Sequence, residues 1–212
     1  TGVRSRAFLL VDNWDDFTYK TLYSLVVYDT HGKQFRVGEV KIGQFEMKDG
    51  GGRPTIPTEF NELDENFFSL GQDDSYYEML NSLGSELRDQ ILRSLRDVAI
   101  DQALFERALD EEVTGISLLR SVPRRIVETQ YSRIARGGVR LSRYEFSYTY
   151  PKADRSKLEP ATLSFVVEPE SMPPTNIHVV IGRNGVGKTF LLNNMSRSLA
   201  DKRAEPSEVE AL

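Results

Sequence analysis

A glycine-rich stretch late in the chain constrains the fold more than any other feature. Residues 182–189 read Gly-Arg-Asn-Gly-Val-Gly-Lys-Thr, which fits the pattern G-x-x-x-x-G-K-[ST]. The apolar run 177–181 precedes this stretch, and leucine or methionine recurs after it at helical spacing, at positions 191, 192, 195 and 199. The pattern predicts a buried strand, a tight loop and a helix, in that order.

The residue types in this loop suit a bound phosphate group. Three glycines allow backbone N–H groups to turn inward around a phosphate, in conformations that a Cβ atom would obstruct. A helix that begins near Lys188 adds its positive N-terminal end. Lys188 would reach the β- and γ-phosphates of a nucleotide, and the Thr189 hydroxyl would bind Mg²⁺. The alternative is a glycine-rich turn that carries Lys-Thr by chance. The predicted cofactor-binding residues are Gly182, Arg183, Asn184, Gly185, Val186, Gly187, Lys188 and Thr189.

The letters of the loop narrow the class of protein. G-R-N-G-V-G-K-T resembles the G-x-N-G-x-G-K-[ST] loop of ABC-type ATPases, particularly the RecF, SMC and OLD-like branch, and the resemblance covers about residues 144–200. It implies ATP as the nucleotide and antiparallel strands ahead of the loop, here within residues 140–167. In that family an aromatic residue that stacks on adenine often precedes the loop strand. Tyr148, Tyr150 and Phe165 are the candidates, although each residue type is more often part of a sheet core.

The later motifs of that family do not follow the loop. The sequence after Lys188 holds no glutamine loop, no L-S-G-G-Q signature and no apolar strand ending in Asp-Glu. Residues 8–12, Phe-Leu-Leu-Val-Asp, have the form of such an acid-bearing strand, but they precede the loop, so Asp12 is expected to end an ordinary strand. No catalytic residue is therefore assigned. The expectation is the ATP-binding N-terminal part of a larger ATPase, truncated within its nucleotide-binding domain.

By the same resemblance, two nucleotide-binding domains would pair as a homodimer to hydrolyse ATP, in DNA metabolism or in defence against foreign DNA. Two other functions remain open. One is the nucleotide-binding subunit of a membrane transporter, against which the long stretch before the loop counts. The other is a protein-interaction module that nucleotide merely stabilises and that performs no catalysis.

The charge of the chain is unevenly distributed. Residues 59–112 hold fifteen Asp and Glu against four Arg, whereas residues 120–143 hold seven Arg and one Glu. The basic segment, from Arg120 to Arg143, either contacts phosphates of DNA or RNA or pairs with the acidic stretch; the second reading is favoured. Asp73, Asp74 and Glu78 are read as the negative start of a helix near Tyr76 rather than as a metal cluster.

The rest of the sequence predicts an α/β protein in two parts. Residues 1–139 are expected to form a β-hairpin with a bulge at positions 38–39, followed by a helical region. In the helical region, Ser85 is expected to cap one helix and Asp101 to start the next, and a further short helix is expected over residues 110–119. Residues 140–212 are expected to form an antiparallel lobe, with strands at 144–150 and 163–167, and then the loop strand and helix of an incomplete ABC-type domain.

Composition removes several classes of protein. The chain has no Cys, which excludes disulfides, iron–sulfur clusters and a cysteine nucleophile. Its two histidines, His31 and His178, are far apart in the sequence, which excludes a multi-histidine metal site. No apolar run reaches the roughly 18–20 residues that a membrane-spanning helix needs, and no signal peptide is visible, so a cytoplasmic protein without membrane contact is expected.

Overall fold

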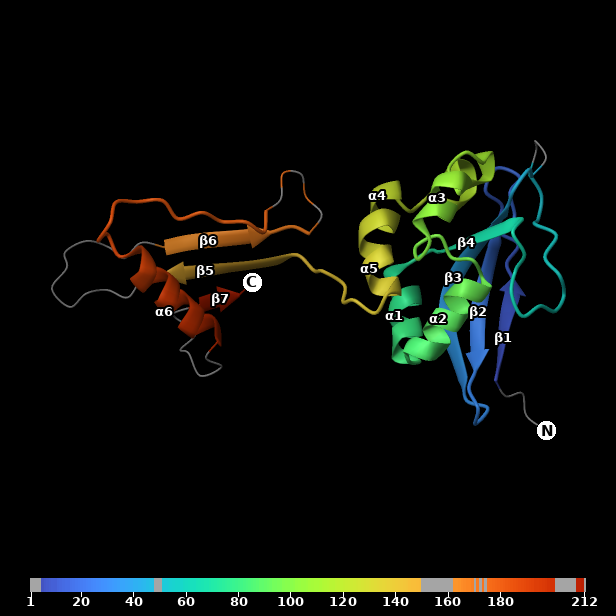
Figure 1. Ribbon diagram of the computed structural model, residues 1–212, viewed down its shortest axis with the longest axis horizontal. Coiled ribbons are helices and arrows are strands. Elements are labelled where there is room, and N and C mark those ends of the chain that lie inside the picture. The colour runs from blue at the N-terminus through green and yellow to red at the C-terminus, as the bar shows by residue number, and fades with distance from the viewer. Residues whose placement is uncertain are drawn as a thin grey trace. The chain divides into compact units, whose positions relative to one another are not determined.

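A computed structural model describes residues 5–47, 51–149, 162–169, 171, 173, 175–200 and 209–211. Its backbone contacts divide the chain into two compact units, Thr1–Arg140 (unit 1) and Leu141–Leu212 (unit 2). Each unit combines antiparallel strands with helices (Figure 1). The expectation of a mixed α/β protein is therefore confirmed at this level.

Unit 1 is built on an antiparallel sheet in the order β1-β2-β3-β4. The four strands span Arg6–Val11, Leu22–Tyr28, Gln34–Gln44 and Phe67–Gly71. The expected hairpin is present as β2 and β3, and so is its bulge: Leu25 faces Gly38, whereas Val26 faces Arg36. Val37 is thus the extra residue, and it is buried together with Val40 on the far side of the bulge. The bulge keeps the apolar side chains inside although the alternation changes phase.

The helical part of unit 1 follows β4. Its elements are α1 (Asp74–Ser82), α2 (Ser85–Ser94), α3 (Gln102–Ala108), the π-helix η1 (Thr114–Leu118), α4 (Arg124–Ile126), the π-helix η2 (Val127–Tyr131) and α5 (Ser132–Ala135). Asp73 and Asp101 cap α1 and α3 through their carboxylates. The helix start at Asp101 was expected; the helix expected near Tyr76 begins at Asp74, and its cap by Asp73 was not foreseen. Ser85 does not cap α2: it is the first helical residue, and Gly84, at φ 99°, takes the N-cap position.

The sequence did not reveal the helical run from Arg124 to Ala135. Its buried side chains Val127, Tyr131 and Ile134 recur at helical spacing, but arginines surround them and a π-helical turn interrupts the α-helix. A Schellman motif ends the run, because Gly137 N–H donates to the Ile134 carbonyl and Gly138 N–H to the Arg133 carbonyl. Gly137, at φ 89°, supplies the left-handed conformation that this motif requires.

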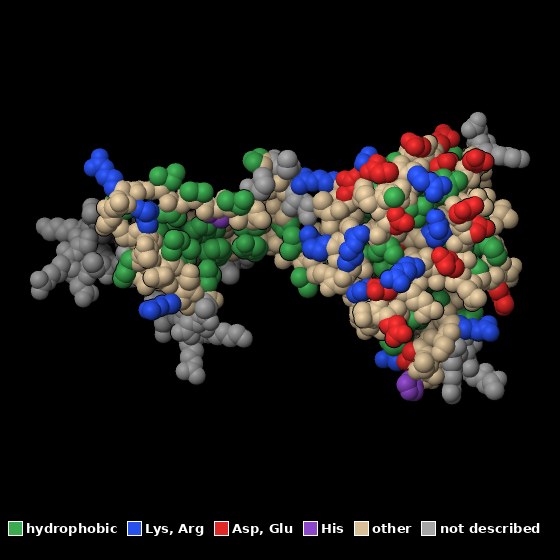
Figure 2. Space-filling view, viewed as in Figure 1, with side chains coloured by type: hydrophobic (Ala, Val, Ile, Leu, Met, Phe, Trp, Pro, Cys, Tyr) green, Lys and Arg blue, Asp and Glu red, His purple; other side chains and the backbone are tan. Residues whose placement is uncertain are grey.

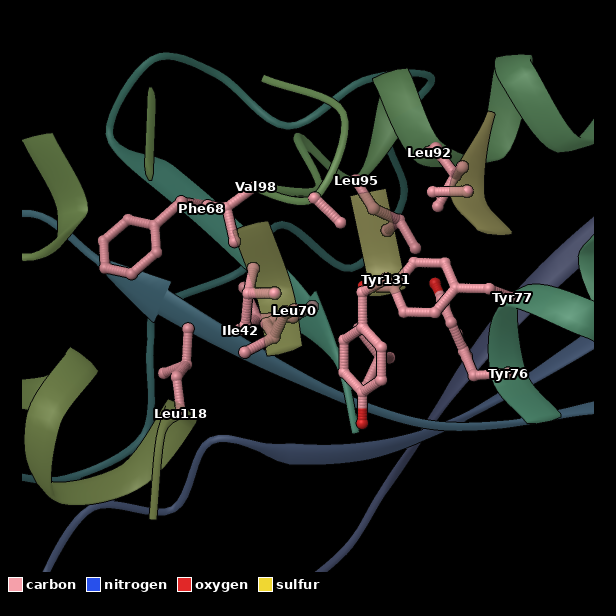
Figure 3. Close-up of a cluster of buried hydrophobic side chains, with 14 of the residues drawn as sticks. Ile42, Phe68, Leu70, Tyr76, Tyr77, Leu92, Leu95, Val98, Leu118 and Tyr131 are labelled. Carbon is pink, nitrogen blue, oxygen red and sulfur yellow. The ribbon is translucent and has the colours of Figure 1, made fainter. Parts of the chain in front are cut away.

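The core of unit 1 lies between the sheet and these helices (Figures 1 and 3). Tyr76 and Tyr77 of α1 are fully buried, and their rings meet edge to face at 5.0 Å. Figure 3 shows them with Tyr131, Leu92 and Leu95 beside the strand side chains Ile42, Phe68 and Leu70. On α3, Leu104, Phe105 and Ala108 are buried in the same core.

Unit 2 holds a three-stranded antiparallel sheet in the order β6-β5-β7 and one helix, α6. The elements span β5 Tyr144–Thr149, β6 Thr162–Val167, α6 Lys188–Ala200 and β7 Val209–Ala211. Tyr144 faces Val167, so the predicted pairing of the two longer strands is confirmed. The strand β7, which pairs with β5, lies in a polar stretch that showed no strand pattern.

One predicted element of unit 2 is wrong. Residues 177–181 form neither strand nor helix, and they are not buried: Ile177, Val179 and Ile181 are 72%, 74% and 90% exposed. A strand exists only through hydrogen bonds to a neighbour, and none of the described strands pairs with this segment. Residues 177–181 have the apolar pattern of a buried strand, but none of the described residues forms a strand beside them.

Candidate functional site

The glycine-rich loop lies between this extended segment and the start of α6. Gly185 and Gly187 have φ angles of 85° and 96°, in the region where a Cβ atom is unfavourable. At Gly182 a Cβ atom would lie 3.0 Å from Cγ2 of Val186, a tight contact with an exposed side chain. Gly185 and Gly187 are therefore the positions of the motif at which the backbone itself favours glycine.

Lys188 turns back over the loop that precedes it. Its Nζ donates to the carbonyl oxygens of Gly182 at 2.8 Å and Arg183 at 2.9 Å. Lys188 is also the first residue of α6, and Leu191 N–H donates to the Gly187 carbonyl in the first helical turn. The geometry thus gathers an ammonium group and a helix N-terminus at one loop, both of which favour a negatively charged ligand.

The remaining loop residues are solvent-accessible. Arg183, Asn184, Val186 and Thr189 are exposed, so the Thr189 hydroxyl is open to a metal ion. Within the described ranges, no group of three or more His, Asp or Glu side chains could hold a metal ion, which leaves Thr189 as the one predicted ligand and gives no support to a cluster at Asp73 and Asp74. Asp12 follows β1 directly in unit 1, and its Oδ1 accepts a hydrogen bond from the Trp14 N–H at 2.8 Å, in the turn after an ordinary strand.

The candidate adenine-stacking residues have separate environments. Tyr148 is only 2% exposed and belongs to the core of unit 2. Phe165 stacks on Phe146 at 4.7 Å and meets the His178 ring edge-on at 5.0 Å. Tyr150 lies outside the described residues. Tyr148 is thus buried, and Phe165 already has two ring contacts within unit 2.

A cavity of about 280 Å³ lies between β5, β6, the segment before the loop and α6. Its walls are mainly apolar and include Phe146, Leu163, Val180, Leu191 and Met195. Figure 2 shows hydrophobic side chains gathered on the visible face of unit 2. Tyr144 and Val180, which also line it, are 51% and 40% exposed, so the cavity opens toward solvent.

The arginines of residues 120–143 mostly face acids or carbonyl groups. Arg124 pairs with Glu106 at 3.0 Å and Glu128 at 2.6 Å, and Arg140 pairs with Asp74 at 3.0 Å. Arg136 donates to the carbonyl oxygens of residues 99 and 100 at 3.2 and 3.0 Å. On the visible face of unit 1, acidic and basic side chains are intermixed (Figure 2). Two of these ion pairs, Arg124–Glu106 and Arg140–Asp74, join the basic segment to the acidic stretch, which supports the favoured reading.

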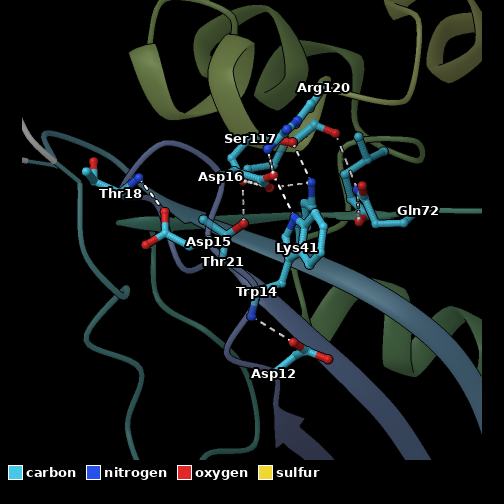
Figure 4. Close-up of polar contacts among 12 residues, drawn as sticks. Asp12, Trp14, Asp15, Asp16, Thr18, Thr21, Lys41, Gln72, Ser117 and Arg120 are labelled. Atoms are coloured by element: carbon cyan, nitrogen blue, oxygen red, sulfur yellow. Dashed lines mark hydrogen bonds and ion pairs between the residues drawn. The ribbon is translucent and has the colours of Figure 1, made fainter.

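A buried ionic network in unit 1 had no signal in the sequence (Figure 4). Asp16 is 1% exposed, and its carboxylate meets Lys41 Nζ at 2.7 Å and Arg120 at 2.6 Å. The hydroxyl of Ser117 also donates to it at 2.8 Å. Burial alone would raise the pKa of Asp16. The hydrogen bonds from Lys41 and Ser117 act in the opposite direction and outweigh the effect of burial, so the pKa is lowered to about 2. Because both carboxylate oxygens are occupied, the network fastens residues 12–21 to η1 and offers no open catalytic group.

A second buried carboxyl, Asp97, has no cationic partner among the described residues. It is 0% exposed and accepts hydrogen bonds from Ala99 N–H at 2.9 Å and from the Tyr77 hydroxyl at 3.1 Å. Burial raises its pKa to about 7, against those hydrogen bonds. It lies under the helices of the core, without access to a ligand, so its effect is on stability.

None of the helices in the described part of the chain is both long and apolar enough to cross a membrane.

Comparison with known proteins gives one informative similarity. No protein-family model matches the chain, and no solved structure matches it. The chain is 36% identical over 193 residues to "Protein ea59" of Escherichia phage lambda. The aligned part is 91% of this chain, so it extends over both units, but it is only 36% of the phage protein. The chain thus spans about a third of the length of this relative.

Proposed function

We propose that this chain binds ATP with Mg²⁺ through residues 182–189 and serves as the nucleotide-binding start of an ABC-type ATPase. The observation that carries the proposal is the placement of Lys188. Its ammonium group lies 2.8 Å from the Gly182 carbonyl, over a loop whose Gly185 and Gly187 take positive φ angles. This combination of motif, loop conformation and helix start suits a phosphate.

Each group of the loop has a distinct task in this proposal. The backbone N–H groups and the start of α6 hold the phosphate oxygens, and Lys188 exchanges its carbonyl contacts for the β- and γ-phosphates. The exposed Thr189 hydroxyl binds Mg²⁺, which neutralises phosphate charge. The role assigned to ATP, rather than another nucleotide, rests on the resemblance of the loop to the RecF, SMC and OLD-like branch.

Hydrolysis belongs to a longer protein in this proposal. Catalysis needs a positioned water or base and further Mg²⁺ ligands, and the described residues offer no acidic cluster for them. The chain spans 36% of the phage protein to which it is similar, so that relative is longer than this chain, and we propose that the further catalytic motifs belong to such a longer protein. Pairing of two nucleotide-binding domains, and work in DNA metabolism or in defence against foreign DNA, are proposed by family analogy.

The test is calorimetric titration of the 212-residue chain with ATP in the presence of Mg²⁺. Lys188→Ala should weaken binding at least about tenfold, because it removes the charge next to the phosphates. Arg197→Ala, which removes a positive charge from the last turn of the same helix, should leave the affinity unchanged. Thr189→Ala should abolish the gain in affinity that Mg²⁺ gives and leave binding in EDTA unaltered. Absence of binding by the wild-type chain, or equal binding by Lys188→Ala, would overturn the proposal.

A further inference from the structure

The two edges of the unit 1 sheet are not alike. The outer edge of β4 is covered, because Ser69 N–H donates to the Arg96 carbonyl at 3.0 Å and Val98 N–H donates to the Ser69 carbonyl at 2.9 Å. The outer edge of β1 has no backbone partner in the described part of the chain; its strand pairs only with β2. β1 therefore ends the sheet with a row of unpaired N–H and C=O groups.

Apart from the charged Arg6 at its start, β1 lacks the features that protect a sheet edge from pairing. Its six residues pair with β2 in unbroken register, without a bulge or a proline. The alternate residues Phe8 and Leu10 share one face and are 37% and 49% exposed, and Val11, on the other face, is 58% exposed. A regular edge strand with exposed apolar side chains is suited to pairing with another strand.

The sequence of this edge is complementary to itself. Residues 6–12 read Arg-Ala-Phe-Leu-Leu-Val-Asp. When two copies pair antiparallel about Leu9, Arg6 of each copy faces Asp12 of the other, and both side chains are exposed. In the same register Phe8 faces Leu10 of the second copy, and Ala7 faces Val11. Attractive charges thus flank an apolar centre on both sides of the two-fold axis.

Other registers lose this match. A slip by one residue turns the apolar side chains to opposite faces, so only slips by two keep the faces aligned. A slip by two in one direction sets Phe8 against Asp12, and in the other it sets Arg6 against Leu10. Each places a charge opposite an apolar side chain, so the register centred on Leu9 is the favourable one.

We propose that unit 1 binds a second copy of this chain through β1, in antiparallel register about Leu9, to form a continuous eight-stranded sheet. The contact of one short strand with its copy is small, so the dimer dissociates on dilution. The surface uses no residue of the glycine-rich loop, and its test is independent of nucleotide binding.

Charge reversal tests the register by sedimentation equilibrium. In the Arg6→Asp variant, each new Asp faces Asp12 of the other copy, and in the Asp12→Arg variant each new Arg faces Arg6, so both variants place two pairs of like charges across the axis. Either substitution should raise the dissociation constant roughly tenfold or more. An equimolar mixture of the two variants should restore dimerisation, because every facing pair is again of opposite charge. Glu59→Arg, an equal charge reversal at an exposed residue outside β1, should leave the dissociation constant unchanged.

Cysteine cross-linking tests the same contact without relying on charge. The chain has no cysteine, so Ala7→Cys and Val11→Cys each introduce a single thiol. Under mild oxidation the mixture of these variants should form a disulfide-linked dimer, and either variant alone should not. A monomer at every concentration, a dimer indifferent to both charge reversals, or equal cross-linking of Ala7→Cys alone would each overturn the proposal.

Discussion

At the scale of single residues, Asp16 and Lys41 show how unit 1 tolerates buried charge. The pair is satisfied on every side. Without Lys41, Asp16 keeps Arg120, whose side chain is 38% exposed, as its one cationic partner among the described residues, so the buried carboxylate is less well compensated. We expect Lys41→Met to lower the free energy of unfolding by about 1–3 kcal/mol, measured by urea denaturation. Lys20→Met, at an exposed lysine, should change it little. Equal stabilities of the two variants would show that the network contributes nothing.

Asp97 gives the stability of unit 1 a dependence on pH. Because its pKa is raised to about 7 from an ordinary value of 3.8, the folded state holds a proton that the unfolded state has released between these pH values. The free energy of unfolding contributed by this group is therefore greatest below about pH 4 and falls as the pH rises toward 7.

Asp97→Asn mimics the protonated carboxyl and should remove this dependence. At pH 8 we expect the variant to be more stable than the wild type by roughly 2–4 kcal/mol, and at pH 5 the difference should shrink. Urea denaturation at the two pH values measures it, with Asp110→Asn, at an exposed carboxyl, as the control. A variant less stable than wild type at pH 8 would mean that the hydrogen bonds to Asp97 hold its charged form in the fold.

At the scale of elements, the contact of β4 with α1 depends on Gly71. A Cβ atom there would lie 2.3 Å from Cδ1 of Tyr76, so the ring or the helix must move. We expect Gly71→Ala to lower the melting temperature through a loss of about 1–3 kcal/mol. Gly115→Ala, in the π-helix η1, meets nothing within 4 Å and should preserve or slightly raise it. Destabilisation of the same size by both variants would contradict this account of the packing.

Elements with local signals could be predicted from the sequence, and those that depend on distant partners could not. The β2–β3 hairpin, its bulge and the capped helices α1 and α3 follow from alternation, turn residues and acidic caps. β4, with all five residues buried, has no alternation to reveal it, and the segment 177–181 has a strand pattern but no strand to pair with.

The glycine-rich loop and the Asp16 network also differ in whether their residues are close together in the sequence. The glycine-rich loop is contiguous in sequence, so its residues and their grouping around Lys188 could be foreseen. The Asp16 network joins Asp16 to Arg120 across 104 positions, and no spacing along the chain announces such a contact. The sequence of residues 6–12 is complementary to itself, but this suggests pairing between two copies only when the structure shows that β1 is an edge strand.

At the scale of the whole molecule, the chain is a pair of units with different contributions. Unit 1 has a continuous buried core, whereas unit 2 carries the loop beside an apolar segment that no described strand covers. We propose nucleotide binding for unit 2 and self-association for unit 1.

Amide hydrogen exchange of the 212-residue chain, with and without Mg²⁺-ATP, is the sharpest test of nucleotide binding by residues 182–189. If the loop holds the phosphates through its backbone, ATP should slow exchange in peptides that cover residues 182–191, and Lys188→Ala should remove that protection. Peptides from β1–β4 should exchange at the same rate with or without nucleotide. Protection confined to other residues, or none at concentrations of ATP that saturate binding, would contradict the assignment of this loop as the nucleotide site.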